Sequence, residues 1–169
     1  MQILLDDRIV NWNVEGSEER PALLLLHGWG SSGATFESLR RELSTQYRFL
    51  TLDFPGFGKS EMPRSAWGVE EYAQFLKTFL NKVEIAPVYV VAHSFGGRVL
   101  LRCLSKGYLT PKKVVLIASA GVNLPPSFKS SILAAAAKVA HILPISIRAR
   151  LRGHFSSADY QNAGEMREI

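Results

Sequence analysis

The sequence contains a single cysteine, Cys103, among its 169 residues. One cysteine excludes a disulfide within the chain and any zinc site built on several cysteines. No apolar run approaches the roughly 20 residues that a membrane-spanning helix needs. The N-terminal residues MQILLDDRIVNW also lack the basic start and the long apolar core of a secretory signal. Together these absences predict a soluble protein of a reducing compartment such as the cytoplasm.

Acidic residues are missing from one long stretch, residues 85–158, although the net charge of the whole chain is only +5. Such asymmetry is typical of proteins that bind an acidic partner or a membrane surface. The plainer alternative is that acidic residues of neighbouring segments balance these charges. The basic residues of the stretch are Arg98, Arg102, Lys106, Lys112, Lys113, Lys129, Lys138, Arg148, Arg150 and Arg152.

The composition, 47% hydrophobic and 21% charged, is ordinary for one globular domain. Continuous apolar runs predict buried strands, and stripes of apolar residues at helical spacing predict helices between them. A strand–helix alternation of this kind predicts an α/β fold with a mostly parallel sheet between two layers of helices. The predicted strands are 22–26, 49–53, 88–93 and 114–119; the helices are 34–44, 69–83 and 98–106; and residues 2–14 are expected to form two short paired strands.

The pattern changes after Gly121. The sequence that follows has helical character, a break near Pro144 and no strand signal. We therefore expect a core over residues 1–122 and a helical cap over residues 123–169.

Ser94 lies where a predicted strand meets a predicted helix, in the sequence AHSFG at 92–96. This pattern differs from the G-x-S-x-G nucleophile elbow only by alanine in place of the first glycine. Small residues are needed on both sides of such a serine because strand and helix cross closely there. The pattern favours Ser94 as a nucleophile, with Gly96 supporting the turn. A serine in an ordinary strand–helix turn is the alternative.

A second motif, HGWG at 27–30, follows the first buried strand. A turn of this kind supplies one backbone N–H of an oxyanion hole, and the residue after the nucleophile supplies the other. The expected donors are therefore Trp29 and Phe95. Gly28 and Gly30 are expected to let the backbone approach the site closely, and His27 is expected to order the loop rather than to act as the base.

A third motif, DFPGFGKS at 53–60, ends like a phosphate-binding P-loop. That motif needs a glycine at the position that Asp53 occupies, and a helix opening where Pro63 follows instead. Nucleotide binding is therefore excluded, and Asp53 is expected to fix the loop.

The segments HGWGSSGATF, DFPGFGKS and AHSFGGRV, in this order, resemble the α/β-hydrolase superfamily over roughly residues 3–121, with a cap-like segment after them. The resemblance implies a serine hydrolase that acts on small esters or related acyl substrates, without cofactor, metal or nucleic-acid partner. Serine at position 94 argues against dehalogenases and epoxide hydrolases of this fold. HGWG is associated with carboxylesterases, some of which act on acyl groups held by acidic carrier proteins.

The expected acid and histidine are harder to find. In this superfamily an acid and then a histidine follow the serine along the chain. Here His141 and His154 precede every acidic residue that follows Ser94, and His93 is expected to point to the opposite face of its strand. The chain therefore resembles the N-terminal part and cap of a hydrolase, and we expect it to be inactive alone. The acidic residues in question are Asp159, Glu165 and Glu168.

Three functions remain open at this point. The first is a hydrolase that is completed by sequence outside this chain, and the second is a non-catalytic binding module of the same fold. The third is association with an acidic carrier or a membrane through the basic cap helices. Residues 114–118 would in addition form an apolar sheet edge, which invites pairing with a complementing chain.

Overall fold

The computed structural model describes residues 1–119, all of which lie in the compact unit Met1–Val122. The predicted cap over residues 123–169 lies outside the described residues, as do His141 and His154. The division into core and cap stays a prediction.

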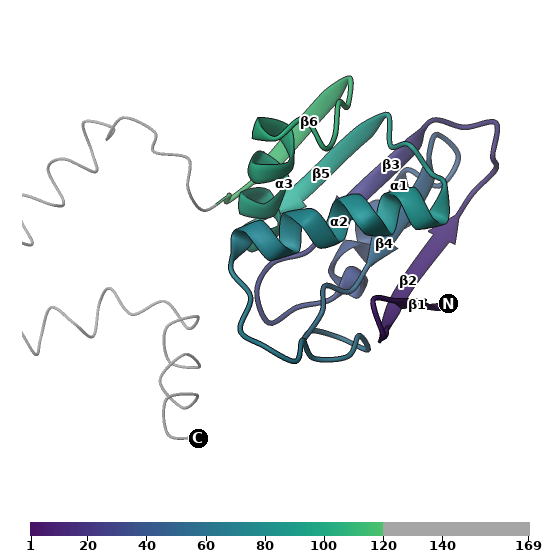
Figure 1. Cartoon of the computed structure of the whole chain (residues 1–169). Helices are drawn as coiled ribbons and strands as arrows, with labels where there is room; N and C mark the ends of the chain where they lie inside the picture. Colours follow the sequence, from purple (N-terminus) through teal and green to yellow (C-terminus); the bar gives the residue numbers. More distant parts are fainter. Residues whose placement is uncertain (120–169) are drawn as a thin grey trace, which may run out of the picture. The chain divides into compact units, whose positions relative to one another are not determined.

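Six strands form one sheet in the order β1-β2-β4-β3-β5-β6 (Figure 1). The four strands β4, β3, β5 and β6 run parallel, while β2 pairs antiparallel with both β1 and β4. The predicted α/β class with a mostly parallel sheet is confirmed. The strands are β1 (Gln2–Leu5), β2 (Arg8–Glu15), β3 (Ala22–Leu26), β4 (Arg48–Leu52), β5 (Tyr89–His93) and β6 (Lys113–Ile117).

Helices cover both faces of this sheet. Helices α2 (Val69–Val83) and α3 (Phe95–Ser105) pack on one face, and α1 (Glu37–Glu42) packs on the other. The segment predicted as one helix from 34 to 44 is a 3₁₀ turn, Gly33–Phe36, followed by the short α1. Helix α3 begins at Phe95, earlier than expected, although Gly96 and Gly97 are weak helix formers.

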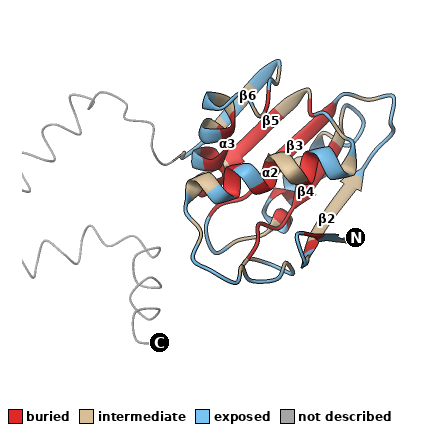
Figure 2. Cartoon of the chain, viewed as in Figure 1, coloured by how far each residue is buried: buried red, intermediate tan, exposed pale blue. Residues whose placement is uncertain are grey.

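The middle of the sheet is the most deeply buried part of the described chain. All five residues of β3 are buried, whereas β6 alternates between exposed and intermediate positions (Figure 2). A strand enclosed by neighbours on both edges and helices on both faces reads as a continuous apolar run, as β3 does. Among the described helices, none has the length and apolarity to cross a membrane.

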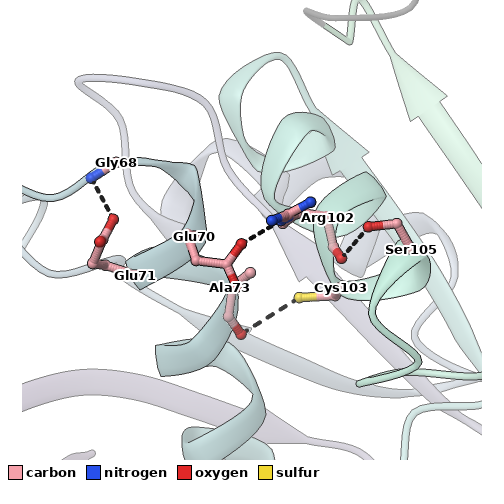
Figure 3. A network of polar contacts seen from close by, with 7 residues as sticks. All are labelled: Gly68, Glu70, Glu71, Ala73, Arg102, Cys103 and Ser105. Carbon is pink, nitrogen blue, oxygen red and sulfur yellow. Dashed lines mark hydrogen bonds and ion pairs between the residues drawn. The ribbon is translucent and has the colours of Figure 1, made fainter.

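Helices α2 and α3 are tied together by side chains (Figure 3). The Arg102 guanidinium forms an ion pair with Glu70, and the Cys103 thiol lies 3.6 Å from the Ala73 carbonyl oxygen. Burial, assisted by the charge of Glu70, raises the pKa of the Cys103 thiol to about 12. Cys103 is therefore a packed, unreactive side chain. Arg102, one of the ten basic residues of the stretch 85–158, already has an acidic partner in Glu70.

Candidate active site

Ser94 occupies the turn between β5 and α3, at the carboxyl end of the strand. Its backbone angles, φ +48° and ψ −110°, lie in a region that non-glycine residues rarely adopt. The Ser94 N–H donates to the Ile117 carbonyl at 2.9 Å, and the Ser94 carbonyl accepts from the Gly97 N–H at 3.1 Å. A strained serine held from both sides in this way is typical of functional sites.

Gly96 sits where α3 crosses the end of β3. A Cβ atom at this position would lie 2.5 Å from the Leu26 carbonyl oxygen and 2.6 Å from that of His27. Both neighbours are backbone atoms that cannot give way, so only glycine allows this approach. A Cβ atom at Gly97 would lie 2.1 Å from the Ser119 hydroxyl oxygen, a proximity that was not predicted from the sequence. The two consecutive glycines, Gly96 and Gly97, are the sequence signal that could have indicated this close packing.

The HGWG loop passes directly beside the serine. A Cβ atom on Gly28 would lie 3.3 Å from Cβ of Ser94, so the loop and the elbow are in van der Waals contact. Gly30 has no neighbour within 4 Å of such an atom, and its φ is +68°. Glycine therefore serves the backbone angle at position 30, and the close approach of the Gly30 backbone to the site stays a prediction.

The two expected oxyanion donors flank this contact. Phe95 is the first residue of α3, where backbone N–H groups have no partner within the helix. Within residues 1–119, neither the Trp29 nor the Phe95 backbone N–H donates to a protein acceptor. The rings of the two residues meet edge to face, with their centroids 5.2 Å apart. Both donors therefore belong to segments that meet at Ser94.

His27 is fully buried, and both of its ring nitrogens are engaged. Nε2 accepts a hydrogen bond from the Phe54 N–H at 2.9 Å, which places the ring proton on Nδ1, 2.8 Å from the Gly28 carbonyl. Burial lowers the pKa of His27, an effect that outweighs the opposing influence of the Gly28 carbonyl and Asp53. The neutral imidazole therefore joins the HGWG loop to the loop after β4.

Asp53 fixes the loop after β4 from inside. Its carboxylate accepts hydrogen bonds from the Gly33 N–H at 2.8 Å, the Asn11 side chain at 2.9 Å and the Lys59 N–H at 3.0 Å. The Asp53 carbonyl oxygen also accepts from the Ser60 hydroxyl at 2.7 Å. This arrangement is consistent with the loop-fixing role expected for Asp53, whereas the participation of Asn11 of β2 leaves no signal in the sequence.

His93 comes immediately before the serine, and its ring reaches the HGWG loop. Its Nδ1 atom lies 2.8 Å from the position that a Cβ atom on Gly28 would occupy, and it has no hydrogen-bond partner among the described residues. No hydrogen bond joins either described histidine to the Ser94 hydroxyl. Within residues 1–119, the serine therefore has the surroundings of a nucleophile but no base.

An aromatic cluster adjoins Ser94 on the side of Trp29. Trp29 is 68% exposed, although it packs edge to face against Phe57 and Phe95 at centroid distances of 4.8 and 5.2 Å. The described residues contain no cluster of His, Cys, Asp or Glu suited to a metal ion. The described part of the site therefore places an apolar wall of aromatic rings beside the Ser94 turn.

Comparisons with known proteins agree with this geometry. The family described as alpha/beta hydrolase fold matches residues 21–141. The YugF hydrolase of Bacillus subtilis is 30% identical over 103 residues, which is 60% of this chain and 38% of that protein. The magnesium-chelatase 30 kDa subunit of Rhodobacter capsulatus is 36% identical over 93 residues, 54% of this chain and 33% of that protein.

Solved structures give the same picture. The crystal structure of a bacterial membrane phospholipase A superposes with a TM-score of 0.69 at 26% identity, over 75% of this chain and 41% of that chain. An esterase from Exiguobacterium antarcticum, 22% identical with a TM-score of 0.63, shares the fold.

 The aligned region amounts to 71% of this chain and 45% of the esterase. The chain spans between 30% and 38% of the length of the curated relatives it matches. On the match over residues 21–141 and the shared architecture, the chain belongs to the α/β-hydrolase family.

Proposed function

We propose that this chain carries the nucleophile and the oxyanion hole of a serine hydrolase that acts on carboxylic esters or related acyl substrates. The observation that carries the proposal is the contact between two loops. The strained Ser94 turn lies against Gly28. The backbone N–H groups of Trp29 and Phe95, which have no acceptor within residues 1–119, therefore belong to segments that meet at this turn.

In this mechanism the Ser94 hydroxyl oxygen attacks the carbonyl carbon of the ester, and the carbonyl oxygen becomes negatively charged. The N–H groups of Trp29 and Phe95 stabilise that charge because they need no reorganisation when it forms. The alcohol leaves, and water then hydrolyses the acyl-serine. The exposed ring of Trp29 gives the acyl group an apolar surface beside the serine.

The base that takes the serine proton comes, in this proposal, from outside the described residues. Both nitrogens of His27 are already engaged, and His93 makes no hydrogen bond to Ser94. A serine hydroxyl without a base is a weak nucleophile. We therefore propose that the acid and the base lie outside residues 1–119.

One relative supports ester chemistry by its printed name, since the solved structure with 26% identity is a phospholipase A. The YugF relative is named a hydrolase, which supports hydrolysis in general. The second candidate function, a binding module without turnover, is favoured by one observation only, the absence of a base beside Ser94 among the described residues.

Labelling with a fluorophosphonate separates the two functions. The probe is added to the full chain with and without imidazole, which supplies a base in solution, and the labelled serine is located by peptide mass spectrometry. We expect imidazole to accelerate labelling at Ser94 and the substitution Ser94→Ala to abolish it. Label spread evenly over exposed serines, with no preference for Ser94, would favour the binding module.

A matched pair of variants tests the oxyanion hole in the same assay. Trp29→Pro removes the backbone N–H, whereas Trp29→Ala removes the ring and keeps the donor. Loss of one oxyanion donor costs about 10²–10³-fold in rate, so we expect labelling of Trp29→Pro to fall by about that factor and Trp29→Ala to label more nearly like the parent. Equal rates for the two variants would contradict a role for this N–H.

A further inference from the structure

The face of the sheet that carries α1 changes character at β2 and β4, which lie side by side (Figure 1). Trp12 of β2 packs against Phe79 of α2 on the opposite face, so Asn11 and Asn13 lie on the α1 face. Asn13 is paired there with Thr51 of β4. The polar stretch of β2 and β4 stands apart from the core of this face, which is apolar. That core consists of Leu23, Leu25, Phe36, Phe49 and Val91.

A carboxylate that already has a partner lies at each end of this polar stretch. At one end, the Asp53 carboxylate accepts hydrogen bonds from the Asn11 side chain at 2.9 Å and from the Gly33 N–H at 2.8 Å. At the other end, Glu15 of β2 forms an ion pair with Arg40 of α1, whose Nη1 atom lies 2.7 Å from the carboxylate. The Arg40 side chain therefore reaches from α1 to β2, and its guanidinium lies near the polar stretch.

A hollow of about 500 Å³, which we call the polar hollow, is lined by Asn13, Thr51, Arg40 and Lys59 together with their neighbours. This volume is within the range of about 300–1,000 Å³ that is typical of small-molecule sites. Thr51 is only 5% exposed, and its hydroxyl oxygen lies 3.3 Å from the position of a Cβ atom on Gly33. Within residues 1–119, no hydrogen bond engages the Thr51 hydroxyl or the Asn13 side chain. Both groups are therefore available to a ligand.

The charges around the polar hollow favour an anion over a metal cation. Glu15 engages only Nη1 of Arg40, so the other N–H groups of this guanidinium have no acceptor within residues 1–119. Lys59 adds a second positive charge to the lining. The one carboxylate of the lining, Asp53, already accepts hydrogen bonds from three N–H donors. A metal cation would have to displace these donors, whereas a carboxylate or phosphate can accept from the guanidinium directly.

We propose that the polar hollow binds a small carboxylate or phosphate that also carries hydroxyl groups. Its anionic group accepts hydrogen bonds from Arg40, and its hydroxyl groups meet the Thr51 hydroxyl and the Asn13 amide, each of which can donate and accept. Neither Ser94 nor Trp29 lines the hollow, so this ligand is not the ester of the proposed reaction. The site is independent of the proposed catalysis.

The test is an NMR titration of the ¹⁵N-labelled full chain with inorganic phosphate, citrate or glycerol, at an ionic strength held constant with sodium chloride. We expect phosphate and citrate to shift the backbone amide signals of Asn13 and Thr51 to saturation, and glycerol to shift them far less. Arg40→Gln should raise the Kd of citrate at least about tenfold, because a hydrogen bond to a charged group is lost. Thr51→Val keeps the shape of the side chain and should raise the Kd about two- to tenfold.

Arg48→Gln is the matched control for the loss of positive charge. Arg48 is 20% exposed and pairs with Glu18, much as Arg40 is 19% exposed and pairs with Glu15, but Arg48 does not line the polar hollow. Its substitution should leave the Kd of citrate unchanged. The spectrum of each variant also shows whether the variant is folded.

Three results would overturn the proposal. The first is the absence of saturable shifts at Asn13 and Thr51 with both phosphate and citrate. The second is an equal loss of affinity in Arg40→Gln and Arg48→Gln, which would mean that the anions respond only to the overall charge of the chain. The third is binding of glycerol as tight as that of the anions. Ser94→Ala should bind citrate like the parent chain, so failure of the proposed catalysis would not affect this result.

Discussion

His27 joins two loops of the candidate site, and its replacement should be costly. Alanine at this position leaves the buried Phe54 N–H without an acceptor and the Gly28 carbonyl without its donor. An unsatisfied buried polar group costs about 1–3 kcal/mol, and loss of the ring contact with Phe54, at a centroid distance of 5.1 Å, adds to it. We therefore expect His27→Ala to lower the free energy of unfolding by about 3–5 kcal/mol.

The same histidine should give the stability a definite pH dependence. Burial lowers the pKa of His27 in the folded chain, so the unfolded chain binds more protons than the folded one once the pH falls below about 6.5. The stabilising contribution is thus complete above the unfolded pKa and is lost as the pH falls toward the folded pKa. One proton gives a limiting slope of about 1.4 kcal/mol per pH unit.

Urea denaturation at several pH values between neutral and mildly acidic measures this slope. His27→Gln keeps an acceptor and a donor but cannot titrate, so its free energy of unfolding should fall less between pH 7 and 5.5 than that of the parent chain. His93→Gln is the matched control. Equal slopes for the parent and His27→Gln, or loss of the slope in His93→Gln instead, would refute the assignment of a buried neutral His27.

Two further predictions concern the glycines and the basic stretch. Gly96→Ala should destabilise the chain far more than Gly30→Ala, because the new Cβ atom would lie 2.5 Å from the Leu26 carbonyl oxygen. Alanine at position 30 meets only an unfavourable φ of +68°, at a cost of about 1–2 kcal/mol. Similar melting temperatures for the two variants would contradict the close crossing of α3 and β3. If the basic stretch binds an acidic surface, the full chain should bind anionic vesicles at low salt and release them as salt rises; no binding at low salt would end that proposal.

Much of the sheet was predictable because its strands are buried runs with little ambiguity. Residues 22–26 form β3 as predicted, and residues 69–83 form α2 as predicted. The start of α3 was missed because Gly96 and Gly97 weaken any local helix signal, whereas the tight packing of α3 on the end of β3 keeps them helical.

The candidate site was predictable in its motifs but not in its connections. Ser94, Gly28 and Gly96 could be singled out because close backbone contacts restrict them to small or special residues. The hydrogen bond from Asn11 to Asp53 could not, since it joins two residues that are 42 positions apart in sequence and leaves no local pattern. The same holds for His93, whose approach to Gly28 depends on how two strands lie side by side.

The most direct measurement is the crystal structure of the fluorophosphonate adduct of the chain. We expect the phosphorus on the Ser94 hydroxyl oxygen, with the phosphoryl oxygen about 2.7–3.1 Å from the backbone nitrogens of both Trp29 and Phe95. An adduct on another serine, or a phosphoryl oxygen that points away from both N–H groups, would contradict the assignment of Ser94 as the nucleophile of this site.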